Sequence, residues 1–108
     1  MKVKNYKDVE LKEERAARGA GIRWLLSERD GMTDMAMRVI EIEPGGQTPQ
    51  HDHPWEHQVF ILKGNGRVVS EGETSTFGPG AAIFVGPNEQ HTFHNDSAET
   101  VEFVCMIP

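Results

Sequence analysis

Cysteine is nearly absent from this sequence, and cationic side chains are scarce. Cys105 has no second cysteine with which to form a disulfide inside the chain, so we expect a reducing compartment, the cytoplasm, and a fold held by its core. Eleven lysine and arginine residues stand against 17 aspartate and glutamate residues, for a formal net charge of −6. An acidic chain is not attracted to nucleic acid or anionic membranes, so the expected partner is a small molecule.

Long apolar runs are missing as well. No uninterrupted apolar stretch approaches the roughly 18 residues of a membrane-spanning helix, and the residues after Met1 lack the apolar segment of a signal peptide. We therefore expect no membrane contact. A length of 108 residues suits one domain, with residues 1–20 as a charge-rich N-terminal arm and residues 36–107 as the main body.

The chain instead has many short stretches rich in β-branched and aromatic residues, separated by glycine and proline. In one of them Arg38, Ile40 and Ile42 share a face of a predicted strand that spans residues 33–43 and ends at Pro44-Gly45-Gly46. The other predicted strands span residues 22–27, 59–62, 67–70, 74–77, 81–85, 91–94 and 101–107. Eight or nine short strands without a helical period predict an all-β sandwich or barrel.

Four of the five histidines form the most informative cluster in the sequence. His51, His53 and His57 fall within seven residues, and His91 follows 34 positions after His57. Residues two or four apart in an extended chain point the same way, so the first three share one face. Neutral imidazole is the commonest protein ligand for transition metals, so these four side chains are the candidate ligands of one metal ion.

One alternative concerns the third of these ligands. If the strand slips by one residue, Glu56 takes the place of His57 in the metal site. The alternation favours His57, because it has the same parity as His51 and His53.

Three further residues are predicted to line the same interior. The parity of the last strand turns Phe103 and Cys105 inward, where Cys105 is either a small buried hydrophobe or a thiol near the metal. Arg38 shares the inward parity of Ile40, and a buried arginine needs an anionic partner. It either holds a substrate carboxylate or, as is more common, pairs with a glutamate. No catalytic residue is evident from the spacing.

The spacing of the histidines resembles the two motifs of the cupins. The first reads Gly45-x5-His51-x-His53-x3-His57-x6-Gly64 and the second Gly80-x10-His91-x3-Asn95, with fifteen residues between Gly64 and Gly80. The resemblance covers roughly residues 36–107. It implies a single-domain cupin fold, a jelly-roll β-barrel or double-stranded β-helix, with a metal near its middle.

His57 stands where most cupins have a glutamate. The phrase His53-Pro54-Trp55-Glu56-His57, together with residues 85–91 and 101–108, is similar to small manganese-binding cupins of thermophilic bacteria that use four histidines. This resemblance implies manganese as the metal, with iron, nickel, copper or zinc as alternatives. Four neutral ligands leave a divalent ion its full charge, so the centre should attract anions.

Two functions are compatible with such a centre. In the first, the chain is an oxygenase or other oxidoreductase that acts on a small, anionic molecule at two open metal positions, an expectation that rests on family analogy. In the second, it is a non-catalytic module that binds a metal or a small ligand. We also expect a homodimer, from the resemblance and because a small barrel with exposed edge strands gains from covering them.

Overall fold

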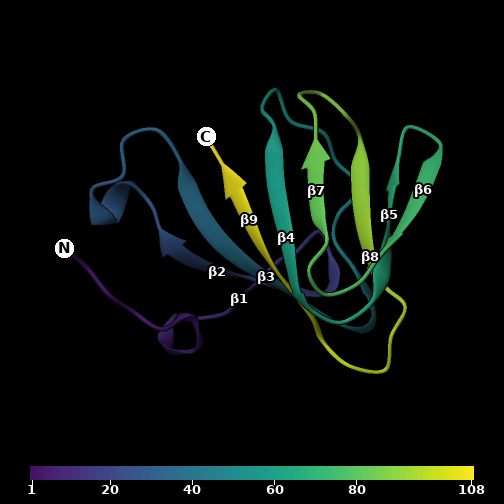
Figure 1. Ribbon diagram of the computed structural model, residues 1–108, viewed down its shortest axis with the longest axis horizontal. Helices are drawn as coiled ribbons and strands as arrows, with labels where there is room; N and C mark the ends of the chain where they lie inside the picture. The colour runs from purple at the N-terminus through teal and green to yellow at the C-terminus, as the bar shows by residue number, and fades with distance from the viewer.

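Nine strands, β1 to β9, form one antiparallel sheet that curls around a buried interior (Figure 1). This computed structural model describes residues 1–108. The strands are β1 (Lys12–Glu13), β2 (Arg18–Leu26), β3 (Ala36–Gln47), β4 (His57–Lys63), β5 (Gly66–Ser70), β6 (Glu73–Phe77), β7 (Ala82–Val85), β8 (His91–Asn95) and β9 (Val101–Ile107). Two short 3-10 helices are η1 (Tyr6–Asp8) and η2 (Glu28–Asp30). The all-β jelly-roll barrel predicted from the sequence is confirmed.

Strand β3 organises the sheet through a change of partner. Along Ala36–Ile42 it pairs with β9, whereas Gln47 near its far end pairs with His94 of β8. Strand β2 lies along the other edge of β3. Because the main order is β6-β5-β8-β3-β9-β4-β7, this change of partner joins the two halves of the curled sheet.

The predicted end of this strand at Pro44-Gly45-Gly46 is wrong, because β3 continues to Gln47. Gly45 has a φ of 77°, a left-handed conformation that lets the strand bend without ending. A Cβ atom at Gly46 would lie 2.6 Å from the backbone oxygen of Arg18, so only glycine lets β2 approach β3 this closely. The two glycines therefore mark a bend in a continuous strand.

The core lies between the walls of the curled sheet. Ile42, Ile61 and Val101 are fully buried, and Phe103 is 1% exposed. In β9 the buried residues alternate with partly exposed ones, as the sequence predicts. Along β3 from Ile42 towards Arg38, this packed core gives way to a cavity.

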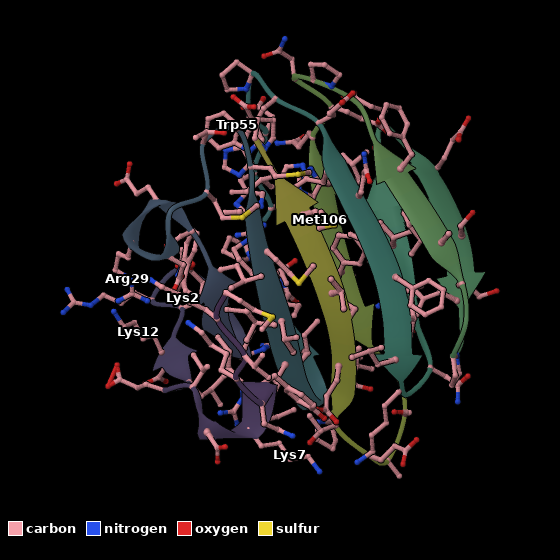
Figure 2. All side chains as sticks on the ribbon, turned by 60° about the vertical axis from the view of Figure 1, so that its left-hand side comes forward. Lys2, Lys7, Lys12, Arg29, Trp55 and Met106 are labelled. Atoms are coloured by element: carbon pink, nitrogen blue, oxygen red, sulfur yellow. The ribbon has the colours of Figure 1, made fainter.

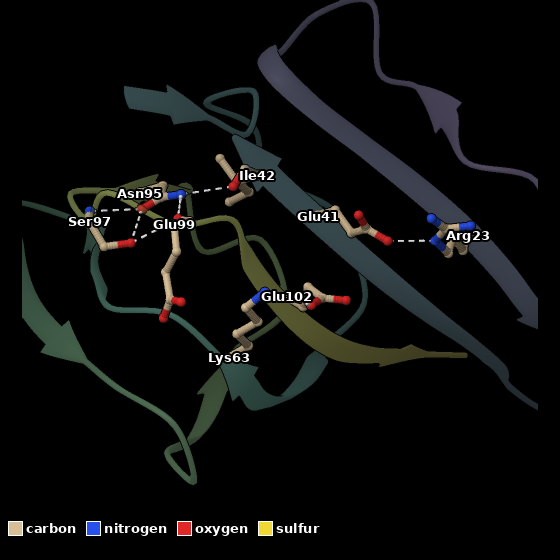
Figure 3. Close-up of polar contacts among 8 residues, drawn as sticks. All are labelled: Arg23, Glu41, Ile42, Lys63, Asn95, Ser97, Glu99 and Glu102. Atoms are coloured by element: carbon tan, nitrogen blue, oxygen red, sulfur yellow. Dashed lines mark hydrogen bonds and ion pairs between the residues drawn. The ribbon is translucent and has the colours of Figure 1, made fainter. Parts of the chain in front are cut away.

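Asn95 ties the turn after β8 to the centre of the sheet (Figure 3). Its Nδ2 donates to the backbone oxygens of Ile42 and Glu99, each at 2.8 Å, and its Oδ1 accepts the backbone N–H of Ser97 at 2.8 Å. The side chain is 2% exposed, so its hydrogen bonds are shielded from water. Asn95 thus stabilises the turn that follows the second histidine segment.

The N-terminal segment is held against the sheet by Arg23 of β2. This side chain pairs with Glu41 of β3 (Figure 3). It also donates a hydrogen bond to the backbone oxygen of Val9. Strand β2 already begins at Arg18, inside the segment expected to be an arm, because its backbone pairs with β3. Neither of the two short helices is long and apolar enough to cross a membrane.

Candidate metal centre

The seven residues singled out from the sequence lie around one cavity of about 280 Å³. They are His51, His53, His57, His91, Arg38, Phe103 and Cys105. The wall also includes Glu14, Trp24, Trp55 and Phe93. The fold therefore gathers side chains that lie far apart in the sequence around a single interior space.

Hydrogen bonds of the backbone position the histidines. His51 and His91 form a β-bridge, in which the His51 N–H donates to the His91 oxygen at 3.2 Å and the His91 N–H donates to the His51 oxygen at 2.9 Å. His57 opens β4 and is paired with Val85 of β7. Between them, His53 stacks on Trp55 with ring centroids 4.6 Å apart. Figure 2 shows Trp55 at the upper end of the barrel.

The four rings are close enough to surround one ion. Their centroids are 4.4 Å apart for His51 and His53, 4.8 Å for His51 and His91, 4.7 Å for His57 and His91, and 6.1 Å for His53 and His91. A metal–nitrogen bond of about 2.1 Å puts a ring centroid about 3.3 Å from the ion, so rings at right angles lie about 4.7 Å apart and opposite rings about 6.6 Å. The observed separations are similar. As the side chains stand, however, no group of three or more His, Cys, Asp or Glu residues is arranged to hold a metal ion, so binding would have to adjust the rings.

The hydrogen bond of His91 leaves its Nε2 free to bind a metal. Its Nδ1 lies 2.9 Å from the backbone oxygen of Glu89. A carbonyl oxygen only accepts, so Nδ1 carries the proton and Nε2 of the neutral ring keeps its lone pair. A backbone carbonyl behind a ligand histidine is the usual way in which a protein orients a metal-binding ring.

His57, and not Glu56, faces the cavity. His57 is 5% exposed, and its Nδ1 is buried without a hydrogen-bond partner. Such an atom costs free energy unless something binds to it, so it is a feature that a metal or another ligand would satisfy. Glu56 is exposed and does not line the cavity. The orientation follows the alternation that the sequence predicts.

Burial favours the neutral form of three of the four histidines, and this is the form that metals require. Burial lowers the pKa of both His51 and His57 to about 4, and electrostatic repulsion from His91 contributes to each shift. Burial lowers the pKa of His53 as well. No proton therefore competes for these nitrogens near neutral pH.

Arg38 is the cation of the cavity wall. It is 9% exposed, its Nη2 donates to Cys105 Sγ at 2.9 Å, and its guanidinium lies 5.3 Å from the centroid of the Trp24 ring. The glutamate partner that is the more common arrangement for a buried arginine is not found, since no carboxylate lies within ion-pair distance. Burial raises the pKa of the Cys105 thiol, while Arg38 acts in the opposite direction.

Two residues of the wall were missed in the sequence. Glu14 lies in the turn between β1 and β2, and its place in the cavity depends on how that hairpin folds onto β3, which has no local signal. Trp24 could have been predicted from the sequence, because Ala20, Ile22 and Trp24 occupy every second position along β2 and therefore share one face. All three line the cavity. Trp24 is also paired directly with Arg38 across the two strands.

Known proteins share this fold over most of their length. The polyketide cyclase RemF from Streptomyces resistomycificus is 33% identical with a TM-score of 0.93, and the match covers 100% of this chain and 79% of that chain. A cupin-2 domain from Rhodospirillum rubrum is 26% identical with a TM-score of 0.83, covering 98% and 73% of the two chains. A predicted oxalate decarboxylase from Thermotoga maritima, at 20% identity and a TM-score of 0.88 over 98% and 97%, is alike in fold alone.

A search among curated proteins found no match. The model of the cupin domain family Cupin_2, in contrast, matches residues 38–107, which include all four histidines of the cavity. The match therefore takes in well over half of the chain and most of its sheet. The chain belongs to the cupin family.

Proposed function

We propose that the four histidines hold one divalent metal ion and that the protein is a metalloenzyme acting on a small, anionic organic molecule. Manganese is the first choice of metal, with iron, nickel, copper or zinc as alternatives. The observation that carries the proposal is the gathering of His51, His53, His57 and His91 at one cavity, with neighbouring rings close to one another. When bound, the ion supplies a Lewis acid that polarises an oxygen of the ligand.

The wall of the cavity supports reaction at a carbonyl group. Ile40, Phe93 and Phe103 provide an apolar surface that keeps water from the ligand. Glu14 is the one carboxylate in the wall, so it is the residue to which we assign the acceptance of a proton from the ligand. Proton removal beside a polarised carbonyl is the class of reaction that these groups could carry out together.

The similarity to a polyketide cyclase favours the same class of chemistry. RemF is 33% identical and the match covers the whole of this chain. A polyketide carries several carbonyl groups, and closing it into a ring requires a nucleophilic carbon beside one of them. The oxygenase activity expected from the sequence has no comparable support in the cavity, although the proposed metal would permit it, so oxygen consumption belongs in the same assay.

The test combines metal content with two assays. Protein purified without chelator is loaded with Mn(II), and exchange of the hydrogens beside the carbonyl of 4-oxopentanoate is followed by proton NMR in deuterium oxide while an electrode records dissolved oxygen. We expect metal-dependent exchange without oxygen consumption. Oxygen uptake coupled to loss of the compound would instead establish the oxygenase.

Glu14→Gln is the matched variant, because it removes the proposed proton acceptor and leaves all four histidines in place. We expect it to retain manganese and to lose most of the exchange. A metal-loaded protein that neither exchanges hydrogens nor consumes oxygen, across a panel of oxo compounds, would contradict catalysis and favour the non-catalytic binding module.

A further inference from the structure

Arg38 is a buried cation that forms no ion pair in the cavity wall. The side chain is 9% exposed and makes a single side-chain hydrogen bond, from Nη2 to Cys105 Sγ at 2.9 Å. Its Nε is fully buried and has no partner. Removing a guanidinium from water costs several kcal/mol unless an anion or several acceptors replace the lost hydration. One thiol does not fulfil this role.

The neighbours of Arg38 orient it without neutralising it. The Trp24 ring lies 5.3 Å from the guanidinium carbon, a cation–π distance, and Trp24 is directly opposite Arg38 in the pairing of β2 with β3. Burial keeps Cys105 in its neutral thiol form, since its pKa is raised. Glu14 also lines the cavity, but it forms no ion pair with Arg38. The guanidinium is therefore held in one direction with its charge uncompensated.

Besides Arg38, the cavity wall has one other charged side chain, the carboxylate of Glu14. The four histidines line the same cavity as Arg38. Glu14 is the only carboxylate in the wall. A buried guanidinium without an ion pair, in a cavity with apolar sides, is suited to bind an organic anion.

We propose that Arg38 is the anchor for a carboxylate of the natural ligand, with Trp24 and Cys105 as the residues that position its guanidinium. Guanidinium and carboxylate make strong, charge-assisted hydrogen bonds, and the fork of arginine matches the two carboxylate oxygens. The ligand class is then a small oxo acid, with its carboxylate on Arg38 and its second oxygen directed to the histidines. The second half of this assignment rests on the function proposed above, whereas the anchoring by Arg38 does not.

The size of the cavity limits the ligand further. A volume of about 280 Å³ lies at the lower edge of the range of about 300–1,000 Å³ that is usual for ligand pockets. Within this space a single anion would contact both Arg38 and the histidine side of the wall. An oxo acid with a short carbon chain fits better than an extended one.

The test compares 4-oxopentanoate with its uncharged methyl ester. Trp24 and Trp55 are the only tryptophans, and both line the cavity, so tryptophan fluorescence reports binding directly in metal-free and in manganese-loaded protein. In Arg38→Met we expect binding of the acid to weaken by about tenfold or more and binding of the ester to stay unchanged. Arg29→Met is the control, because Arg29 is exposed outside the cavity (Figure 2) and should leave both affinities within about twofold.

Thermal unfolding separates anchoring from a structural role. Methionine removes an uncompensated buried charge, so the melting temperature of ligand-free Arg38→Met should equal or exceed that of the wild type. A large drop in the melting temperature together with unchanged affinity for the acid would mean that Arg38 only supports the fold, and it would overturn the proposal. Unchanged affinity with unchanged stability would overturn it as well.

One measurement on the wild-type protein covers the case in which the variant does not fold. The Nε–H resonance of Arg38 in a nitrogen-15 NMR spectrum should shift when 4-oxopentanoate is added and stay in place with the methyl ester. No shift at a saturating concentration of the acid would contradict the anchor. Because the experiment needs no metal, its outcome stays interpretable even if the metal-dependent function proposed above fails.

Discussion

At the scale of single residues, His57 determines the character of the proposed centre. The resemblance to the cupin motif predicts a glutamate at this position. A histidine in its place leaves four neutral donors around the cavity. The side chain is buried, and its Nδ1 has no protein partner. A metal or another ligand in the cavity would supply the missing partner.

Replacing His57 tests this role directly. We expect His57→Asn to lower the affinity for Mn(II) by at least about tenfold, because one of four donors is lost. His94→Asn is the matched control, since His94 does not line the cavity. Competition with a fluorescent chelator measures both variants. Equal metal affinity of His57→Asn and the wild type would remove His57 from the proposed set of ligands.

The lowered pKa values of His51 and His57 predict how stability depends on pH. In metal-free protein both pKa values fall from 6.5 to about 4 on folding. Between these limits the unfolded chain binds protons that the folded chain does not, so the free energy of unfolding decreases as the pH falls from 6.5 towards 4. Above 6.5 both states are neutral and the contribution is constant.

Urea unfolding of metal-free protein at several pH values measures this dependence. The double variant His51→Asn/His57→Asn should show a smaller loss of stability over the same pH interval, because asparagine does not titrate. A wild-type protein whose urea midpoint is unchanged between about pH 7 and pH 4.5, or a double variant with an undiminished slope, would contradict the assignment of these groups.

Arg38 and Cys105 show which features of the site can be predicted from the sequence. The alternation along β3 correctly predicts that Arg38 points inward. Its contact with Cys105 could not be predicted, because the two residues are 67 positions apart in the sequence. For Cys105 the sequence allows either a small buried hydrophobe or a thiol near the metal. It is both buried and part of the cavity wall, while its relation to a metal stays a prediction.

At the scale of elements, the strands were predictable where inward and outward residues alternate. Strands β4 to β9 lie within a few residues of their predicted positions. Most of them end at a turn that contains glycine or proline, and β4 and β9 also alternate buried residues with exposed or partly exposed ones. The predicted end of β3 is too early, because two consecutive glycines indicate a turn by local rules, whereas Gly45 and Gly46 form a bend within the strand. The β1–β2 hairpin, which brings Glu14 to the cavity, has no turn signal that local rules recognise.

The bend in β3 has a testable role in positioning the histidines. A methyl group in Gly46→Ala would lie 2.6 Å from the Arg18 oxygen, so β2 and β3 must move apart. We expect a loss of about 1–3 kcal/mol in the free energy of unfolding and weaker manganese binding, because β3 leads directly to His51.

The control for this variant is Gly72→Ala, in a turn where no atom lies within 4 Å of the added methyl group. Gly72 has a φ of 81°, so its replacement costs backbone strain and should leave manganese affinity unchanged. Chemical unfolding and chelator competition measure both variants. A Gly46→Ala protein as stable as the wild type would show that the close approach of β2 is not required.

At the scale of the whole molecule, one outer face of the sheet is unusually apolar. Phe84 is 65% exposed and Phe60 48% exposed on neighbouring strands, β7 and β4. Met106 of β9 lies on the same outer side (Figure 2), next to Phe60 and Phe84 in a shallow apolar groove. Apolar area of this kind is typical of a surface that another molecule covers.

The homodimer expected from the sequence would use this face. We predict a dimer by light scattering at high micromolar concentration, and a monomer for the double variant Phe60→Asp/Phe84→Asp, because two buried carboxylates would oppose association. Both side chains are outside the cavity, so the variant should keep its affinity for manganese. A wild-type protein that remains monomeric at that concentration would contradict the expectation.

The proposed binding of one metal ion by the four histidines can be observed directly in a crystal. Anomalous scattering at the manganese edge, from a crystal of the protein loaded with Mn(II), tests it most directly. We expect one strong peak per chain within bonding distance, about 2.1–2.3 Å, of a nitrogen of each of His51, His53, His57 and His91. A fully loaded crystal with no peak among these rings, or with its peak bound by carboxylates elsewhere on the surface, would contradict it.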